Sequence, residues 1–286
     1  INKGSYLPIK FLPMPELKQL GNLKFSYDNK LIKFGGEISV SSYDKNKISD
    51  INNDKNIGFA RKLFFELLPY DLIINNNNFG KISLYVKDRF LDSLYSPFER
   101  IDNIEFNRDY NISSLVGEQI LREFELKYSP INNVNNYLKY GYLKQGDNLT
   151  SKRFFDKLGF SISNWLNATY QIDFVNSTFS SFKTNWLKQN GNISLQYKSF
   201  STGVEFQSEE KKESLDSKSR LNNNSLSFYE INPFAGYKIS NGSNIKISFS
   251  KREESFPIDG IIRKQSNAVT EKIEFNFNEF KEISSN

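Results

Sequence analysis

The sequence predicts an all-β fold, built as an antiparallel meander of hairpins. Three observations carry this prediction. Apolar and polar residues alternate over runs of nine to eleven residues, short turn motifs separate these runs, and the apolar residues are unusually aromatic. The 286-residue chain has 26 Phe and 15 Tyr but only two Trp and one Met. Aromatic rings of this kind pack well on the pleated, half-buried surface of a sheet.

The clearest alternation lies between Leu166 and Phe174, where every second side chain is apolar and those between are polar. A helix would distribute the same residues around its axis, so the period of two predicts a strand. The same pattern predicts further strands at Leu23–Ser26, Leu31–Val40, Tyr137–Lys144, Ile193–Tyr197, Tyr229–Ile239, Ile245–Phe249 and Ile273–Phe277.

Short turn motifs predict how these strands connect. Asn-Gly accepts the positive φ angles of a two-residue hairpin, and closely linked strands must be antiparallel because a parallel crossover needs a longer connection. The predicted turns are Tyr27–Lys30, Gln145–Asn148, Gln189–Asn192 and Ser240–Ser243. Longer polar stretches predict loops at Ser41–Asn56, Asn75–Asn78 and Ser208–Asn224.

Two segments fit a helix as well as a strand. Apolar residues from Phe59 to Leu68 fall at helical spacing before Pro69, and those from Val116 to Phe124 do so after a capping serine. Both alternatives stay open at these segments.

The whole chain, residues 1–286, fits a single β-rich domain or a segment of a larger barrel, with a soft subdivision near residue 115. Because residue 1 is Ile and the start does not resemble a signal peptide, we expect a processed form or a piece.

Composition excludes several kinds of site. The chain has no Cys and no His, which excludes disulfides, zinc–thiolate sites, Ser-His-Asp triads and HExxH motifs. The sequence contains no run of 18 apolar residues, so no transmembrane helix is predicted. The net charge of +5 comes from interspersed Lys, Arg, Asp and Glu, so nucleic acid is not an expected partner. We predict that the chain is not an enzyme.

Two architectures fit strands with one apolar and one polar face. In a membrane barrel the apolar face meets lipid and the polar face lines a lumen, whereas in a soluble sandwich the apolar face packs on a second sheet. A tilted membrane strand needs about 9–11 residues, which the longest runs provide. Thr178–Leu187 speaks against the barrel, because its bulky residues do not share one face. A partial outer-membrane β-barrel is the favoured prediction, and a soluble sandwich or extended sheet is the alternative.

The Asn-, Lys-, Phe- and Tyr-rich strands resemble those of β-rich outer-membrane proteins, of the large barrel or translocon type, from Bacteroidetes-like bacteria. The segments that carry the resemblance are Phe98–Arg100, Glu105–Tyr110 and Gly203–Phe206. It implies the bacterial outer membrane, a part in the passage or assembly of other molecules, and contact with membrane lipid or lipopolysaccharide and with other envelope proteins. The alternative is a periplasmic or secreted protein that binds glycans or protein partners.

Oxygen-bearing side chains recur at every second position at Asp50, Asn52, Asp54 and Asn56, a candidate Ca²⁺ site. Asx-rich turn chemistry explains the same residues without a metal. We expect no other cofactor. Candidate acid–base carboxylates are Asp102, Glu105, Asp109, Glu123 and Glu125, whose separation in space the sequence does not give.

Overall fold

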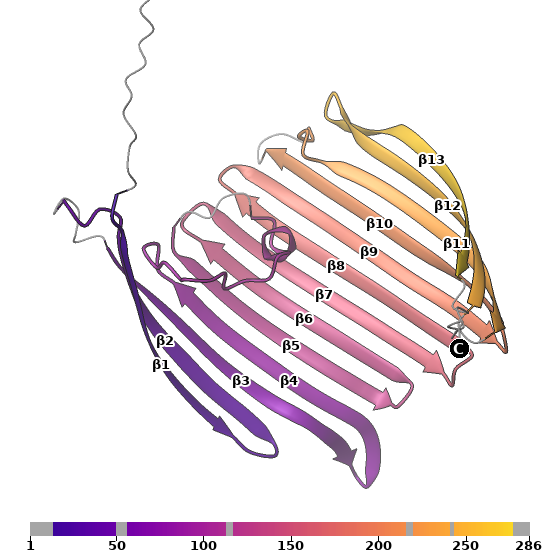
Figure 1. The fold of residues 1–286 in the computed structure, drawn as a ribbon, viewed down its shortest axis with the longest axis horizontal. Coiled ribbons are helices and arrows are strands. Elements are labelled where there is room, and N and C mark those ends of the chain that lie inside the picture. The colour runs from indigo at the N-terminus through magenta and orange to yellow at the C-terminus, as the bar shows by residue number, and fades with distance from the viewer. Residues whose placement is uncertain (1–13, 50–55, 113–116, 216–219, 241–242, 277–286) are drawn as a thin grey trace, which may run out of the picture.

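The computed structural model describes residues 14–49, 56–112, 117–215, 220–240 and 243–276. Thirteen antiparallel strands follow one another in chain order in a single sheet (Figure 1), which confirms the predicted all-β meander. The strands are β1 (Leu17–Asp28), β2 (Ile32–Asp44), β3 (Ile57–Ile74), β4 (Asn77–Leu91), β5 (Gln119–Ile131), β6 (Val134–Gln145), β7 (Leu149–Ile162), β8 (Leu166–Phe179), β9 (Phe182–Tyr197), β10 (Phe200–Leu215), β11 (Leu226–Ser240), β12 (Ser243–Ile258) and β13 (Ile261–Asn276).

One short helix, α1 (Phe106–Asp109), lies in the long connection between β4 and β5. No helix among the described residues has the length and apolar character needed to cross a membrane. In the same part of the chain no second sheet packs on the first, so the sandwich alternative is not found. As far as the structure describes the chain, β1 pairs only with β2 and β13 only with β12, which leaves the sheet unclosed.

The two ends of the sheet differ in their connections. At one end, here called the turn end, every connection has two or three residues: 29–31, 75–76, 132–133, 163–165, 198–199 and 241–242. At the other, the loop end, connections range from two residues to the 27 residues 92–118 between β4 and β5. Positive φ angles at Asn75, Asn76 and Lys198 show the left-handed backbone that such tight turns require.

Four sequence predictions are corrected. The segments from Phe59 to Leu68 and from Gln119 to Phe124 belong to strands β3 and β5, so the helical alternative is wrong there. The predicted turn Gln189–Asn192 lies inside β9, and β10 continues through the first half of the predicted loop, to Leu215. Gly191 suits a strand here because the Phe206 ring occupies the space where a side chain would stand.

The sheet is curved like a trough (Figure 1). Its central strands lie farther from the viewer than β1 and β13, so the concave face is turned toward the viewer. Antiparallel partners share a face, which lets the register assign every strand residue to the concave or the convex side. The convex side carries large exposed apolar residues on every strand, such as Leu23, Ile193 and Ile273, which are 70%, 58% and 60% exposed.

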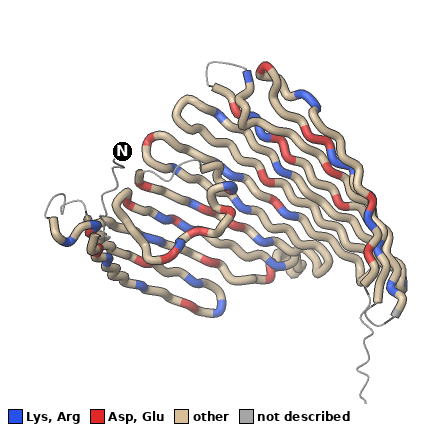
Figure 2. The backbone as a smooth tube through the Cα atoms, turned by 45° about the horizontal axis from the view of Figure 1, so that its top comes forward, with Lys and Arg blue, Asp and Glu red and all other residues tan. Residues whose placement is uncertain are grey.

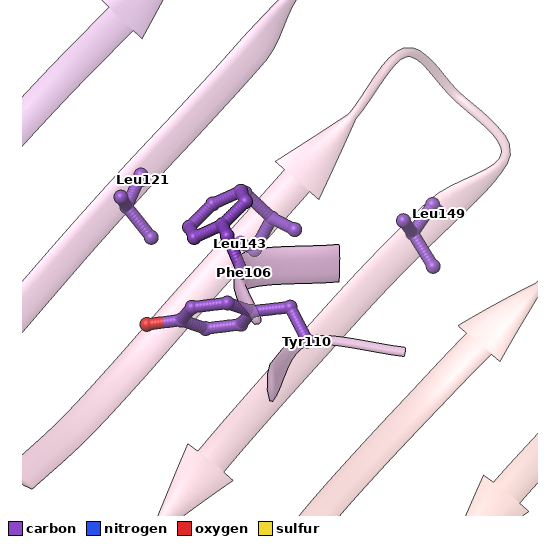
Figure 3. Packing of buried hydrophobic residues seen from close by; sticks show 5 residues of the cluster. All are labelled: Phe106, Tyr110, Leu121, Leu143 and Leu149. Carbon is purple, nitrogen blue, oxygen red and sulfur yellow. The ribbon is translucent and has the colours of Figure 1, made fainter. Parts of the chain in front are cut away.

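The buried core is small and lies on the concave side, beneath α1. Its members are Phe106, Tyr110, Leu121, Leu143 and Leu149. Three of these residues come from neighbouring strands and two from the connection that crosses them (Figure 3). Apolar burial therefore holds this connection on the sheet, whereas most of the apolar surface of the strands stays uncovered on the convex side.

Candidate functional site

Residues 92–112 of the β4–β5 connection fold over the concave face, and we call them the inward segment. Near its start, the Ser96 N–H donates to Ser41 Oγ on β2 at 2.9 Å, and Pro97 O accepts from Lys18 Nζ on β1 at 2.5 Å. Near its end, Arg108 pairs with Glu209 on β10 at 3.1 Å. The inward segment therefore reaches contacts on strands from β1 to β10, and Figure 1 shows it in front of the central strands.

Two aromatic rings anchor the inward segment. Phe106 and Tyr110 lie 5.1 Å apart and pack on the leucines of β5, β6 and β7 (Figure 3). Tyr110 fits closely over Gly141, because a Cβ atom added there would overlap the tyrosine hydroxyl. That hydroxyl donates a 2.7 Å hydrogen bond to Glu123. Burial raises the pKa of Tyr110, helped by the Glu123 charge, so the phenol stays protonated and remains a donor.

Glu123 is the centre of the polar cluster on the concave face. Its side chain is 4% exposed and accepts three charged or polar donors: Tyr110, Lys87 and Lys139, the last at 2.8 Å. Lys139 also reaches Glu125, at 3.3 Å. A buried carboxylate is tolerated only when opposite charges and hydrogen bonds replace its hydration, which these three donors do.

Two arginines of the sheet hold carboxylates of the inward segment. Arg89 pairs with both oxygens of Asp102, at 2.6 and 3.1 Å. Arg153 pairs with Asp109 at 2.6 Å and at the same time makes two 2.9 Å hydrogen bonds to Asp173 on β8. Charge-assisted bonds of this kind are the strong class, and they fix both position and orientation. Figure 2 shows acidic and basic residues interspersed along the central strands.

A small cavity of about 140 Å³ remains between the inward segment and the sheet. Its lining residues are Lys62, Lys87, Arg89, Ile101, Asp102, Asn103, Phe106, Asp109, Tyr110, Glu123, Lys139 and Arg153. The three carboxylates of this lining each have a cationic partner. The arrangement is suited to holding the inward segment in place along a polar surface.

Only one of the four residues of the predicted Ca²⁺ site lies within the described part of the chain. Asp50, Asn52 and Asp54 lie outside the described residues, and Asn56 accepts a hydrogen bond through its backbone oxygen from Tyr43 N at 2.8 Å. Within the described ranges, no group of three or more Asp or Glu residues is placed to hold a metal ion. The Ca²⁺ site therefore stays a prediction.

The predicted carboxylates are largely brought together. Asp102, Asp109, Glu123 and Glu125 all belong to the cluster, whereas Glu105 faces outward and lies 3.8 Å from Arg108. Sequence reasoning missed Tyr110 and the arginines that hold the segment. The signal available in the sequence was the set of charged residues at mid-strand positions on the polar face. A strand surface that only has to be soluble has no need for charged residues where a loop covers it.

The chain has no match among the models of known protein families, and none among the curated proteins.

Replacing Glu123 by Gln is expected to destabilise the fold by about 3 kcal/mol, because Lys87 and Lys139 then lose their buried counter-charge. The measurement is the free energy of unfolding from chemical denaturation. Glu125→Gln is the matched control: Glu125 is more exposed, shares Lys139 with Glu123, and has as a further neighbour the Tyr137 hydroxyl, which a glutamine oxygen can still accept from, so less than about 1 kcal/mol is expected. Equal losses in both variants would contradict the central position given to Glu123.

Replacing Gly141 by Ala is expected to release the inward segment while the strands persist, because the new methyl group occupies the place of the Tyr110 hydroxyl. Hydrogen exchange at residues 101–112 should rise at least tenfold relative to β5–β8. Gly21→Ala is the control, since nothing lies within 4 Å of a Cβ atom there. Unchanged exchange in the Gly141 variant would show that Tyr110 does not anchor the segment.

Proposed function

We propose that the chain forms part of the wall of a β-barrel in a bacterial outer membrane. In this proposal the concave polar face lines a passage for other molecules, and the inward segment narrows that passage. The observation that carries the proposal is the arrangement of the apolar convex residues, which cross the sheet as an oblique band. The proposed role is structural and transport-related, without enzymatic chemistry.

Every strand contributes to the band. Members from successive strands are Phe25, Ile38, Leu63, Val86, Phe124, Tyr140, Leu158, Tyr170, Ile193, Val204, Pro233, Ile247 and Ile273. Most are 39–60% exposed, so large exposed apolar residues recur on strand after strand, whereas soluble monomers usually expose such residues singly. Asp156 interrupts the band on β7, where its carboxylate accepts a 2.5 Å hydrogen bond from Asn136.

The band does not follow the direct cross-strand pairs. The pairs that begin at Leu126 on β5 pass through Leu138, Asp156, Ile172 and Gln189, and they end at Ser208 on β10. On β5 the apolar convex residues are centred on Leu126, but on β10 they are centred near residue 203. The band therefore moves by about five residues over five strand steps, toward the turn end.

This drift has a simple geometric meaning. One residue along a strand is about 3.3 Å and one step between strands about 4.8 Å, so the drift corresponds to an angle of about 35°. Strands of membrane barrels tilt by about 35–45°, and an apolar zone parallel to the membrane then crosses the sheet at that angle. A sheet covered by another protein layer has no reason to show such a slope.

Tyrosines border the band at the turn end. Tyr27, Tyr70, Tyr128, Tyr197 and Tyr237 all lie on convex positions close to the short turns. A tyrosine ring suits a membrane–water boundary because its body is apolar and its hydroxyl needs water or a polar group. Membrane barrels also have short turns on the periplasmic side and longer loops outside, which supports placing the inward segment on the outer side.

The free edges of the sheet require partners in this proposal. Backbone N–H and C=O groups cannot stay unpaired in hydrocarbon, so β1 and β13 must pair with additional strands. These strands come from the same polypeptide or from another envelope protein. Membrane lipid covers the convex face between the edges.

The proposal predicts opposite responses of the two faces to charge. Ile193→Arg places a cation in the middle of the band and should lower the stability of the vesicle-inserted fold by about 2–4 kcal/mol. Asn190→Arg, on the concave face of the same strand, should cost less than about 1 kcal/mol. The measurement is the free energy of unfolding from phosphatidylcholine vesicles, followed by the β-sheet circular dichroism signal.

A folded, monodisperse chain in buffer without detergent would end the membrane assignment. Ile193→Arg would then be nearly neutral, since the side chain it replaces is already 58% exposed. That result would favour the soluble alternative, an extended sheet whose convex face binds a partner.

A further inference from the structure

We propose that a patch of cations just beyond the loop-end border of the apolar band binds the phosphate groups of lipid headgroups. This inference rests on the proposed membrane function and names the lipid chemistry that the wall recognises. The patch, called the basic rim, consists of Arg61, Arg122, Lys144 and Lys152. They lie on β3, β5, β6 and β7, and the register places all four on the convex face.

The basic rim carries more positive than negative charge. Asp88 is shared between Arg61 and Arg122, at 3.5 and 3.1 Å. Lys144 lies 3.5 Å from Asp147, whose side chain is 99% exposed. Lys152 is exposed and pairs with no carboxylate of the described chain. Four cations thus face two carboxylates, both partly or fully in solvent, so the rim can still attract an anion.

The spacing of the rim suits a phosphate. Arg122 lies directly opposite Tyr142, and Tyr142 lies directly opposite Lys152. Arg122 and Lys152 are therefore two strand steps apart, a backbone separation of about 10 Å. This separation leaves room for a phosphate group between their long side chains, above the Tyr142 ring. Arg binds phosphate through two parallel N–H donors and Lys through a point charge.

The position of the rim decides the source of the phosphate. Phe154 and Phe124 of the apolar band follow immediately on the turn-end side of Lys152 and Arg122. A cation at the border of a lipid-facing band lies at the depth of the headgroups, with its aliphatic stem along the acyl region. A soluble phosphate has no preference for this depth, so the geometry favours a lipid-borne one.

The opposite border of the band has a different composition. Convex strand residues next to the short turns are uncharged, as in Phe34, Tyr70, Phe160, Tyr197, Tyr237 and Phe275. Charge is therefore concentrated at one border only. Such asymmetry fits a bilayer whose outer leaflet is richer in phosphate than its inner one, and it matches the orientation proposed from the loops.

The chain itself offers a matched control. Lys127, Tyr137 and Lys157 repeat the arrangement of Arg122, Tyr142 and Lys152 on the same three strands, but on the concave face. Lys127 and Lys157 are both exposed. Removing this pair changes the net charge by the same amount without touching the lipid-facing border.

The experiment measures lipid selectivity with the chain inserted in phosphatidylcholine vesicles. Spin-labelled phosphatidic acid and spin-labelled phosphatidylcholine are compared by the fraction of each that the protein immobilises. We expect phosphatidic acid to be preferred, and Arg122→Gln with Lys152→Gln to reduce that preference by about tenfold. Lys127→Gln with Lys157→Gln should retain it. The charge-conserving variant with Arg122→Lys and Lys152→Arg should also retain the preference for phosphatidic acid. It is the variant to measure if the neutral pair folds poorly.

Each outcome has a defined meaning. Immobilised lipid without preference for phosphatidic acid overturns the basic rim but leaves the membrane wall standing. A complete lack of immobilised lipid contradicts the membrane wall itself. If inorganic phosphate, at the ionic strength of a chloride control, abolishes the preference, the rim binds phosphate whatever its source, and the assignment to lipid-borne phosphate is overturned. If the rim variant and the control variant lose the preference for phosphatidic acid equally, the effect is due to net charge alone and the proposed site is overturned.

Discussion

The continuous register of the hydrogen-bonded ladder is the constraint on which the rest of the structure depends. Side chains alternate between faces, so a slip of one residue anywhere would exchange the apolar and polar sides of every later strand. The irregularities lie near strand ends, and two of them surround Pro69 and Pro130. Proline lacks the N–H group that the ladder needs, so a local bulge accommodates it while the middle of the sheet stays in register.

The same ladder assembles the polar cluster. It places Glu125, Lys139, Phe155, Asp173 and Lys188 directly opposite one another on five successive strands. Acidic and basic residues therefore meet across strands, although they are far apart in the sequence. The inward segment adds a second layer of charge, in which Asp102 and Asp109 are paired with arginines of the sheet. The cluster thus depends on the register first and on the segment second.

Local patterns predicted most strands and several turns, because alternation and Asn-Gly act over a few residues. They failed where a distant residue decides. Thr178–Leu187 lacked a common apolar face because it contains the β8–β9 turn, whose Ser180 has a φ of 53° without a Gly or Asn signal. Gly191 looked like a turn but lies between the stacked rings of Tyr170 and Phe206. The inward segment has no local signature, since its course is set by contacts with strands that follow it.

The two faces also influence one another through the dielectric. Glu123 and Arg153 lie between the inward segment on one side and the sheet with its apolar convex band on the other. Ion pairs strengthen as water and high-dielectric surroundings are removed, provided that each charge keeps its partners. A convex face immersed in lipid would keep water from that side of the wall, so the contacts that hold the inward segment would be firmer there than in the same sheet surrounded by solvent. Whether lipid or water covers the convex face therefore affects how firmly the inward segment is held on the concave face.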